Sequence, residues 1–198
     1  MMEARNWTTL FEDELERIAA PHEWAFTLDS TLQKQSDGWL IYTPWTFGRF
    51  RCSFCSNCWD SAQVNLLFLL KLYRFRRCGE VKLRIFKQKC RMCTFPVMEE
   101  PEISQENIRI AIANLVNRIQ RKIYGKNNCI KDQKPVAPDN YIEGPHKKEH
   151  CEACQAKVCY TSMLNMDRNI KGDIFGLVPM LLAVLFIIIV IIILIKCN

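Results

Sequence analysis

Paired cysteines are the residues in this sequence whose type and spacing most clearly suggest chemistry. Cys52 and Cys55 form one Cys-x-x-Cys pair, and Cys90 and Cys93 form a second. Two cysteines three positions apart in a tight turn can direct both sulfurs to one point, and four thiolates at about 2.3 Å satisfy a tetrahedral zinc ion. The gap between the pairs is longer than the usual zinc-ribbon spacing. The pattern still predicts a structural zinc site.

A third pair, Cys151 and Cys154, lies much further along the chain and is also predicted to bind zinc. It either forms its own site or completes a site shared with one of the first pairs. The remaining ligands of a separate site would come from Cys129, His146, His150 or Cys159. Cys58 follows Cys55 at the same spacing, so a Cys55–Cys58 pair is a further alternative. The cysteines could instead be buried free thiols that bind no metal, but three separate Cys-x-x-Cys pairs favour metal binding.

Strands are expected to position the first two pairs. Residues 47–52 and 81–85 read as strands that lead into Cys52 and Cys90, and an apolar run beginning at Val64 predicts a long strand between them. Further strands are expected at 24–28 and 39–43. An amphipathic helix is predicted over the first residues, and a second over about 104–124, with Ser104 as N-cap and one apolar face covering the sheet.

An uncharged apolar stretch occupies residues 174–195. Its length meets the roughly 20 apolar residues that a helix needs to cross a bilayer. Residues 1–20 are rich in acidic residues and have no apolar central region, so no signal peptide is predicted. We expect a C-terminal anchor in the endoplasmic reticulum membrane, the plasma membrane or both, with the N-terminal domain in the cytosol. Cytosolic thiols stay reduced, which favours zinc over disulfides for the eleven cysteines.

These features predict an α+β protein: a small antiparallel β-sheet of zinc-ribbon type with flanking helices, plus one C-terminal transmembrane helix. The 198 residues and net charge of +6 fit one modest domain with appendages. The expected organisation is an N-terminal helix with strands (1–46), a zinc-finger domain with three pairs (47–159) containing a loop over about 126–149, a juxtamembrane tether (160–173) and the anchor (174–195).

Basic residues interleaved with aromatic ones follow the apolar run. A candidate surface for nucleic acid or for an anionic membrane is made by Arg74, Arg76, Arg77, Lys82, Arg84 and Lys87. Strand alternation would place Lys82 and Arg84 on one face, opposite Val81 and Leu83. Such a strip suits RNA phosphates with base stacking, or the anionic cytosolic leaflet, or it is a solvated strand face.

Three segments together resemble the receptor-transporting proteins: residues 47–55 (Phe-Gly-Arg-Phe-Arg-Cys-Ser-Phe-Cys), residues 81–90 (Val-Lys-Leu-Arg-Ile-Phe-Lys-Gln-Lys-Cys) and residues 151–154 (Cys-Glu-Ala-Cys). The resemblance covers roughly residues 7–159 and the anchor. It implies a zinc-finger accessory protein that faces the cytosol and helps G-protein-coupled receptors, odorant and bitter-taste receptors among them, to reach the cell surface. The partners would be the receptors' cytosolic loops or transmembrane region.

The same resemblance implies an alternative. One branch of the family is interferon-induced and restricts RNA viruses by binding viral RNA, a function that the basic strip would serve. Catalysis is not expected, because the three histidines fall in no recognisable hydrolase motif. The Cys-x-x-Cys pairs also follow strands, whereas a redox pair opens a helix in a βαβ unit. The sequence therefore predicts an interaction protein.

Overall fold

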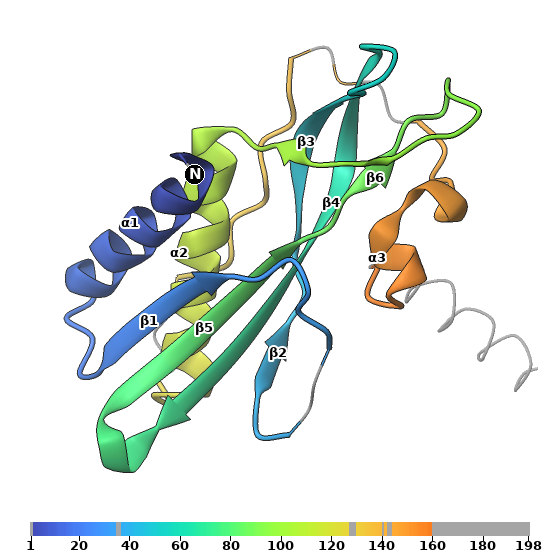
Figure 1. Ribbon diagram of the computed structural model, residues 1–198. Helices are drawn as coiled ribbons and strands as arrows, with labels where there is room; N and C mark the ends of the chain where they lie inside the picture. The colour runs from blue at the N-terminus through green and yellow to red at the C-terminus, as the bar shows by residue number, and fades with distance from the viewer. Residues whose placement is uncertain (1, 35–36, 127–129, 140, 142–143, 160–198) are drawn as a thin grey trace, which may run out of the picture. The chain divides into compact units, whose positions relative to one another are not determined.

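The structure, a computed structural model, describes residues 2–34, 37–126, 130–139, 141 and 144–159 (Figure 1). All of them belong to one compact unit, Met1–Tyr160. Its elements in chain order are α1 (Met2–Arg17), β1 (Glu23–Leu28), β2 (Leu40–Tyr42), β3 (Trp45–Arg51), β4 (Cys58–Tyr73), a 3₁₀ turn (Arg74–Arg76), β5 (Cys78–Ile85), β6 (Gln88–Lys89), β7 (Met98–Glu99), β8 (Pro101–Glu102), α2 (Gln105–Lys122), a second 3₁₀ turn (Lys148–His150) and α3 (Glu152–Gln155).

The main sheet has six strands, with the path β1-β5-β4-β3-β8 and β2 also paired to β4. It is not wholly antiparallel as predicted, because β1 runs parallel to β5, with Glu23 opposite Cys78 and Leu28 opposite Leu83. Alternation along a strand reports which face is buried but carries no information on the direction of its neighbour. Strands β3 and β4, on either side of the first metal-binding loop, pair antiparallel, as do β4 and β5.

Strand β4 is the centre of the sheet and is buried on both faces. Every residue from Val64 to Leu70 is buried. Val64, Phe68 and their even-numbered neighbours join one apolar core, whereas Leu67 and Leu69 join a second core on the opposite face. A strand covered on both faces reads as a continuous apolar run. This explains why the segment from Val64 to Leu70 lacks the polar–apolar alternation of a half-buried strand.

Helices α1 and α2 lie beside each other and cover the first face of the sheet (Figure 1). The amphipathic pattern of α1 buries Trp7, Phe11 and Leu15. Ser104 begins α2 as its N-cap, and its hydroxyl accepts a hydrogen bond of 3.3 Å from the Asn107 N–H. The apolar face of α2 then packs on the sheet core, so both helices fasten the strands from one side.

The opposite face of the sheet is covered by α3 and the residues around it (Figure 1). Leu67, Leu69 and Phe86 pack there against the segment that contains Cys151 and Cys159. Among the described residues no helix is long and apolar enough to cross a bilayer. The predicted transmembrane stretch, residues 174–195, lies outside the described residues, as does the predicted tether.

Candidate metal centres

The first two Cys-x-x-Cys pairs meet at one point. Strand β3 ends at Arg51 and β6 ends at Lys89, so each pair begins directly after a strand. The ligand atoms of Cys52, Cys55, Cys90 and Cys93 all lie within 4.8 Å of one another. Two sulfur–sulfur distances, Cys52–Cys93 and Cys55–Cys90, are each 3.7 Å. Tetrahedral zinc with bonds of about 2.3 Å requires sulfurs about 3.8 Å apart, so this cluster fits the ion.

Backbone groups hold the first pair in a tight turn. The Cys52 N–H donates to the Asn57 carbonyl at 2.8 Å, and the Ser56 N–H donates to the Cys52 carbonyl at 3.0 Å. The Cys55 N–H points at the Cys52 sulfur at 3.4 Å, and the Met92 N–H points at the Cys90 sulfur at the same distance. N–H donors stabilise negative charge on a sulfur, so both loops are built for thiolates.

The four thiols cannot all ionise side by side without a cation. Although burial opposes ionisation of Cys90, the N–H of Met92 and the neighbouring thiols lower its pKa to about 7. The pKa of Cys93 shifts the other way, to about 12, because its thiol donates a hydrogen bond to Cys55 and is partly desolvated. The metal-free cluster therefore keeps protons that a bound cation would displace.

A carboxylate behind the first pair fixes its loop, and sequence reasoning missed it. Glu99, on β7, accepts hydrogen bonds of 2.7 Å from both the N–H and the hydroxyl of Ser53. These two bonds lower the pKa of Glu99, so its carboxylate stays charged beside the metal-binding loop. Glu99 acts on the cluster through Ser53 and is not itself a ligand. An acidic residue on the strand after a Cys-x-x-Cys pair was the only signal in the sequence.

The third pair forms a second cluster of its own. The ligand atoms of His146, Cys151, Cys154 and Cys159 lie within 4.8 Å of one another. The His146 Nε2 atom is 3.1 Å from the Cys154 sulfur and 3.6 Å from the Cys159 sulfur. Hydrogen bonding to Cys159, followed by burial, raises the pKa of the Cys151 thiol. One imidazole and three thiolates are a common tetrahedral zinc set.

This second cluster decides between the alternatives that the sequence left open. His150 is directed elsewhere, with its Nδ1 atom 3.3 Å from the Lys89 carbonyl, and Cys129 lies outside the described residues. Cys58 belongs to neither cluster. It begins β4, is exposed, and its sulfur lies 3.6 Å from the Ser56 carbonyl. The alternative Cys55–Cys58 pair is therefore not the arrangement in the structure.

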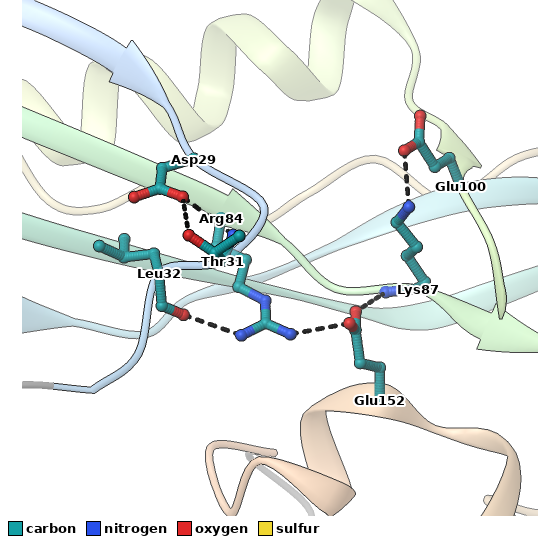
Figure 2. A network of polar contacts seen from close by, with 7 residues as sticks. All are labelled: Asp29, Thr31, Leu32, Arg84, Lys87, Glu100 and Glu152. Atoms are coloured by element: carbon teal, nitrogen blue, oxygen red, sulfur yellow. Dashed lines mark hydrogen bonds and ion pairs between the residues drawn. The ribbon is translucent and has the colours of Figure 1, made fainter.

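Glu152 fastens the second cluster to the sheet, as Figure 2 shows. One carboxylate oxygen lies 2.7 Å from the Arg84 guanidinium, and the other accepts the Lys87 N–H at 2.8 Å. Arg84 also donates to the Leu32 carbonyl at 2.8 Å, and its guanidinium lies 4.6 Å from the centre of the Phe86 ring. Because Glu152 lies between Cys151 and Cys154, this contact orients both cysteines.

The predicted basic strip does not form one free surface. Arg84 is occupied by Glu152, and the Lys87 ammonium lies 2.8 Å from Glu100. Lys82 shares the Arg84 side of β5, as alternation predicts, and its ammonium sits 5.1 Å from the Trp39 ring centre. The other three basic residues lie at the far end of β5, in the turn between β4 and β5. Strand alternation gives the face of a residue but not its partner on a neighbouring element.

Residues 45–157 match the family described as a zinc-binding domain, a zinc ribbon with three Cys-x-x-Cys pairs. The chain is also 33% identical over 155 residues to human receptor-transporting protein 4 and 32% identical over 158 residues to mouse receptor-transporting protein 2. These alignments cover 77% and 78% of the chain, and 63% and 70% of the relatives. The chain belongs to the receptor-transporting protein family. No solved structure matches it.

The receptor-transporting proteins differ in how much of their length the chain covers. It spans 63% of human receptor-transporting protein 4 and 34% of mouse receptor-transporting protein 3, to which it is 30% identical. The zinc-binding family matches residues 45–157 of this chain. Family membership therefore agrees with zinc as the metal of this domain, and the two clusters offer four ligand atoms each.

Proposed function

We propose that this chain is a membrane-anchored accessory protein that promotes the trafficking and surface expression of G-protein-coupled receptors, of the odorant or bitter-taste class. Membership of the receptor-transporting protein family is the observation that carries the proposal. The uncharged apolar stretch 174–195 supports an anchor in the endoplasmic reticulum or plasma membrane, with the zinc domain on the cytosolic side. Receptor cytosolic loops or transmembrane segments would be the contacts.

We further propose that zinc is held by Cys52, Cys55, Cys90 and Cys93 in one site, and by His146, Cys151, Cys154 and Cys159 in the other. Each set fills all four positions of a tetrahedral ion and leaves none open for substrate, which is the pattern of structural zinc. The proposed role of the metal is to hold the loops and α3 on the sheet. This supports an interaction function in which the protein performs no catalysis.

The trafficking proposal is tested by co-expression. Receptors of the two classes are expressed with the full chain, with a chain lacking residues 174–195, and with a Cys90→Ser chain, and receptor at the cell surface is measured by antibody on intact cells. The full chain should raise the surface signal, and both variants should fail. A Cys58→Ser chain is the matched control, because Cys58 lies in neither cluster. Equal surface signal with and without the full chain would refute the proposal.

The antiviral alternative comes from the family resemblance, with the basic strip as its RNA-binding surface, and the contacts of Arg84 and Lys87 give those two residues a structural role. The turn between β4 and β5 keeps three exposed arginines.

A further inference from the structure

The turn between β4 and β5, Arg74–Arg77, presents an aromatic ring to solvent on an ordered backbone. Arg74–Arg76 form a 3₁₀ turn, and Arg77 closes it in the left-handed conformation, with φ of 54° and its N–H donating to the Arg74 carbonyl at 3.2 Å. The Phe75 side chain is fully exposed, at 107% of its reference area. We call these four residues the arginine turn.

A partly buried aromatic ring fixes the strand that leaves the arginine turn. Gly79 lies directly beneath the Trp24 indole, and a Cβ atom built at Gly79 would come within 2.5 Å of that ring. The Trp24 Nε1–H donates to the Tyr124 hydroxyl at 2.9 Å, just beyond the end of α2. Arg74 reaches the same end of α2, with its guanidinium 3.4 Å from the Ile123 carbonyl. The arginine turn therefore projects into solvent from a base that is held by contacts with Trp24 and the end of α2.

The charge of this projection is positive throughout. Three of its four residues are arginines, all exposed, and the last turn of α2 adds Lys122, whereas Arg121 beside it is paired with Asp132. Within the described part of the chain, no ion pair joins an arginine of the turn to a carboxylate. Of the nearest acids, Glu80 lies opposite Lys71 and accepts from the Tyr73 hydroxyl at 3.4 Å, and Glu23 contacts the turn through its N–H.

We propose that the arginine turn contacts the anionic face of a lipid bilayer, with Phe75 entering the interface and the arginines binding lipid phosphates. An apolar side chain flanked by cations is the combination that interfacial segments use, and guanidinium binds phosphate through paired donors. A single projecting ring suits a broad, flat surface. Single-stranded RNA instead requires a groove that follows several phosphates and stacks successive bases.

The predicted membrane anchor would keep a bilayer close to the arginine turn. This part of the inference rests on the anchor in the proposed function. Residues 160–173 separate the described domain from the predicted membrane span. Fourteen residues extend at most about 50 Å at roughly 3.5 Å each. A contact that is weak by itself gains from such a tether, because the second binding event becomes intramolecular.

Another exposed apolar group on the domain provides the matched control. Phe95 follows the second Cys-x-x-Cys pair and is 90% exposed, but it lies in the loop that ends at Glu99 and Glu100 on or beside β7. Near Phe95, Glu99 and Glu100 offset the charges of Lys87 and Arg91, so this loop lacks the excess positive charge of the arginine turn. Phe95 therefore matches Phe75 in size and exposure and differs from it in neighbouring charge.

The test uses residues 1–160, which contain both apolar cores and both metal clusters in one compact unit. Binding is measured by flotation with vesicles of phosphatidylcholine alone and with vesicles that also contain phosphatidylserine. The wild-type domain should bind only the anionic vesicles and release them as salt rises. Arg76→Gln with Arg77→Asn, the latter tolerated at positive φ, should lower binding about 30-fold. Phe75→Ser should also lower it.

Two control variants should leave vesicle binding unchanged. One is Phe95→Ser, and the other is Lys131→Gln with Lys134→Gln, which removes two charges from exposed residues elsewhere. Zinc content and melting temperature equal to those of the wild-type domain show that each variant is folded. If the double variant unfolds, Phe75→Ser, which alters no charge, still tests the contact with the vesicle. No wild-type binding, or equal losses in turn and control variants, would overturn the proposal. Loss of single-stranded RNA binding with vesicle binding intact would assign the turn to RNA instead. Receptor delivery is not measured, so the trafficking proposal can fail separately.

Discussion

Two residues outside any Cys-x-x-Cys pair, His146 and Cys159, complete the second cluster. At this scale the sequence showed the paired cysteines clearly, because the spacing itself encodes a turn that aims two sulfurs together. It could not choose His146 over His150, since both are close to Cys151 along the chain. The choice depends on how α3 docks against the sheet, where His146 Nε2 comes 3.1 Å from the Cys154 sulfur.

We predict that Cys159→Ser lowers the zinc content of residues 1–160 from two ions per chain to one, because three ligands hold the ion far less tightly than four. Metal analysis after dialysis measures the content. Cys58→Ser is the control and should keep both ions, since its sulfur lies in neither cluster. Two retained zinc ions in Cys159→Ser would show that Cys159 is not a ligand.

A second prediction concerns Glu99, whose carboxylate holds the Ser53 loop. Glu99→Gln should weaken zinc binding at the first cluster by about tenfold, the lower end for a lost outer-shell partner. Competition with a chromophoric chelator measures this. The lowered pKa of Glu99 means that its carboxylate acts at neutral pH and loses its effect only as pH falls below its ordinary value. Glu102→Gln, on an exposed residue of β8, is the control and should leave zinc affinity unaltered.

At the scale of elements, the ion pair between β5 and α3 joins the second cluster to the sheet. The Arg84 and Glu152 side chains are only 14% and 21% exposed. We predict that Glu152→Gln destabilises the domain by about 1–2 kcal/mol, between the values for exposed and buried pairs. Denaturant unfolding measures the loss, and a cycle with Arg84→Gln isolates the coupling.

Glu100→Gln is the matched control for Glu152→Gln. It removes a second carboxylate, which pairs with Lys87 just after β5 but is 71% exposed. Its loss should change stability by less than about 0.5 kcal/mol. If both variants cost the same, the Arg84–Glu152 contact is not what fastens α3.

Most elements could be predicted from local pattern, and the exceptions share a cause. Ser104 and the apolar face after it predicted α2, and alternation predicted the buried face of β5. Local pattern could not show that β1 pairs parallel to β5 or that Arg84 faces Glu152, 68 residues away. Both depend on which distant segments meet across the sheet. For the same reason the sequence could not show that Arg84 and Lys87 of the basic strip have acidic partners, since a charged residue on an outward face is free only if no later element covers it.

For the whole molecule, zinc and folding should be linked through protons. Without metal, Cys93 has a pKa of about 12 and is protonated at neutral pH. A zinc ion binds thiolate, so binding releases protons and is favoured as pH rises. We predict that apparent zinc affinity falls with decreasing pH, by about tenfold per pH unit for each proton displaced. Chelator competition across a pH series measures this, and affinity that is independent of pH would contradict it.

Two closed zinc sites are expected to hold this domain together, one at the ends of β3 and β6 and one around α3. Native mass spectrometry of residues 1–160 at neutral pH tests this expectation most directly, with unfolding followed before and after a strong chelator. We expect two zinc ions per chain and loss of cooperative unfolding when both are removed, because metal binding supplies folding free energy in small zinc domains. A domain that unfolds cooperatively at the same temperature with fewer than two zinc ions would contradict it.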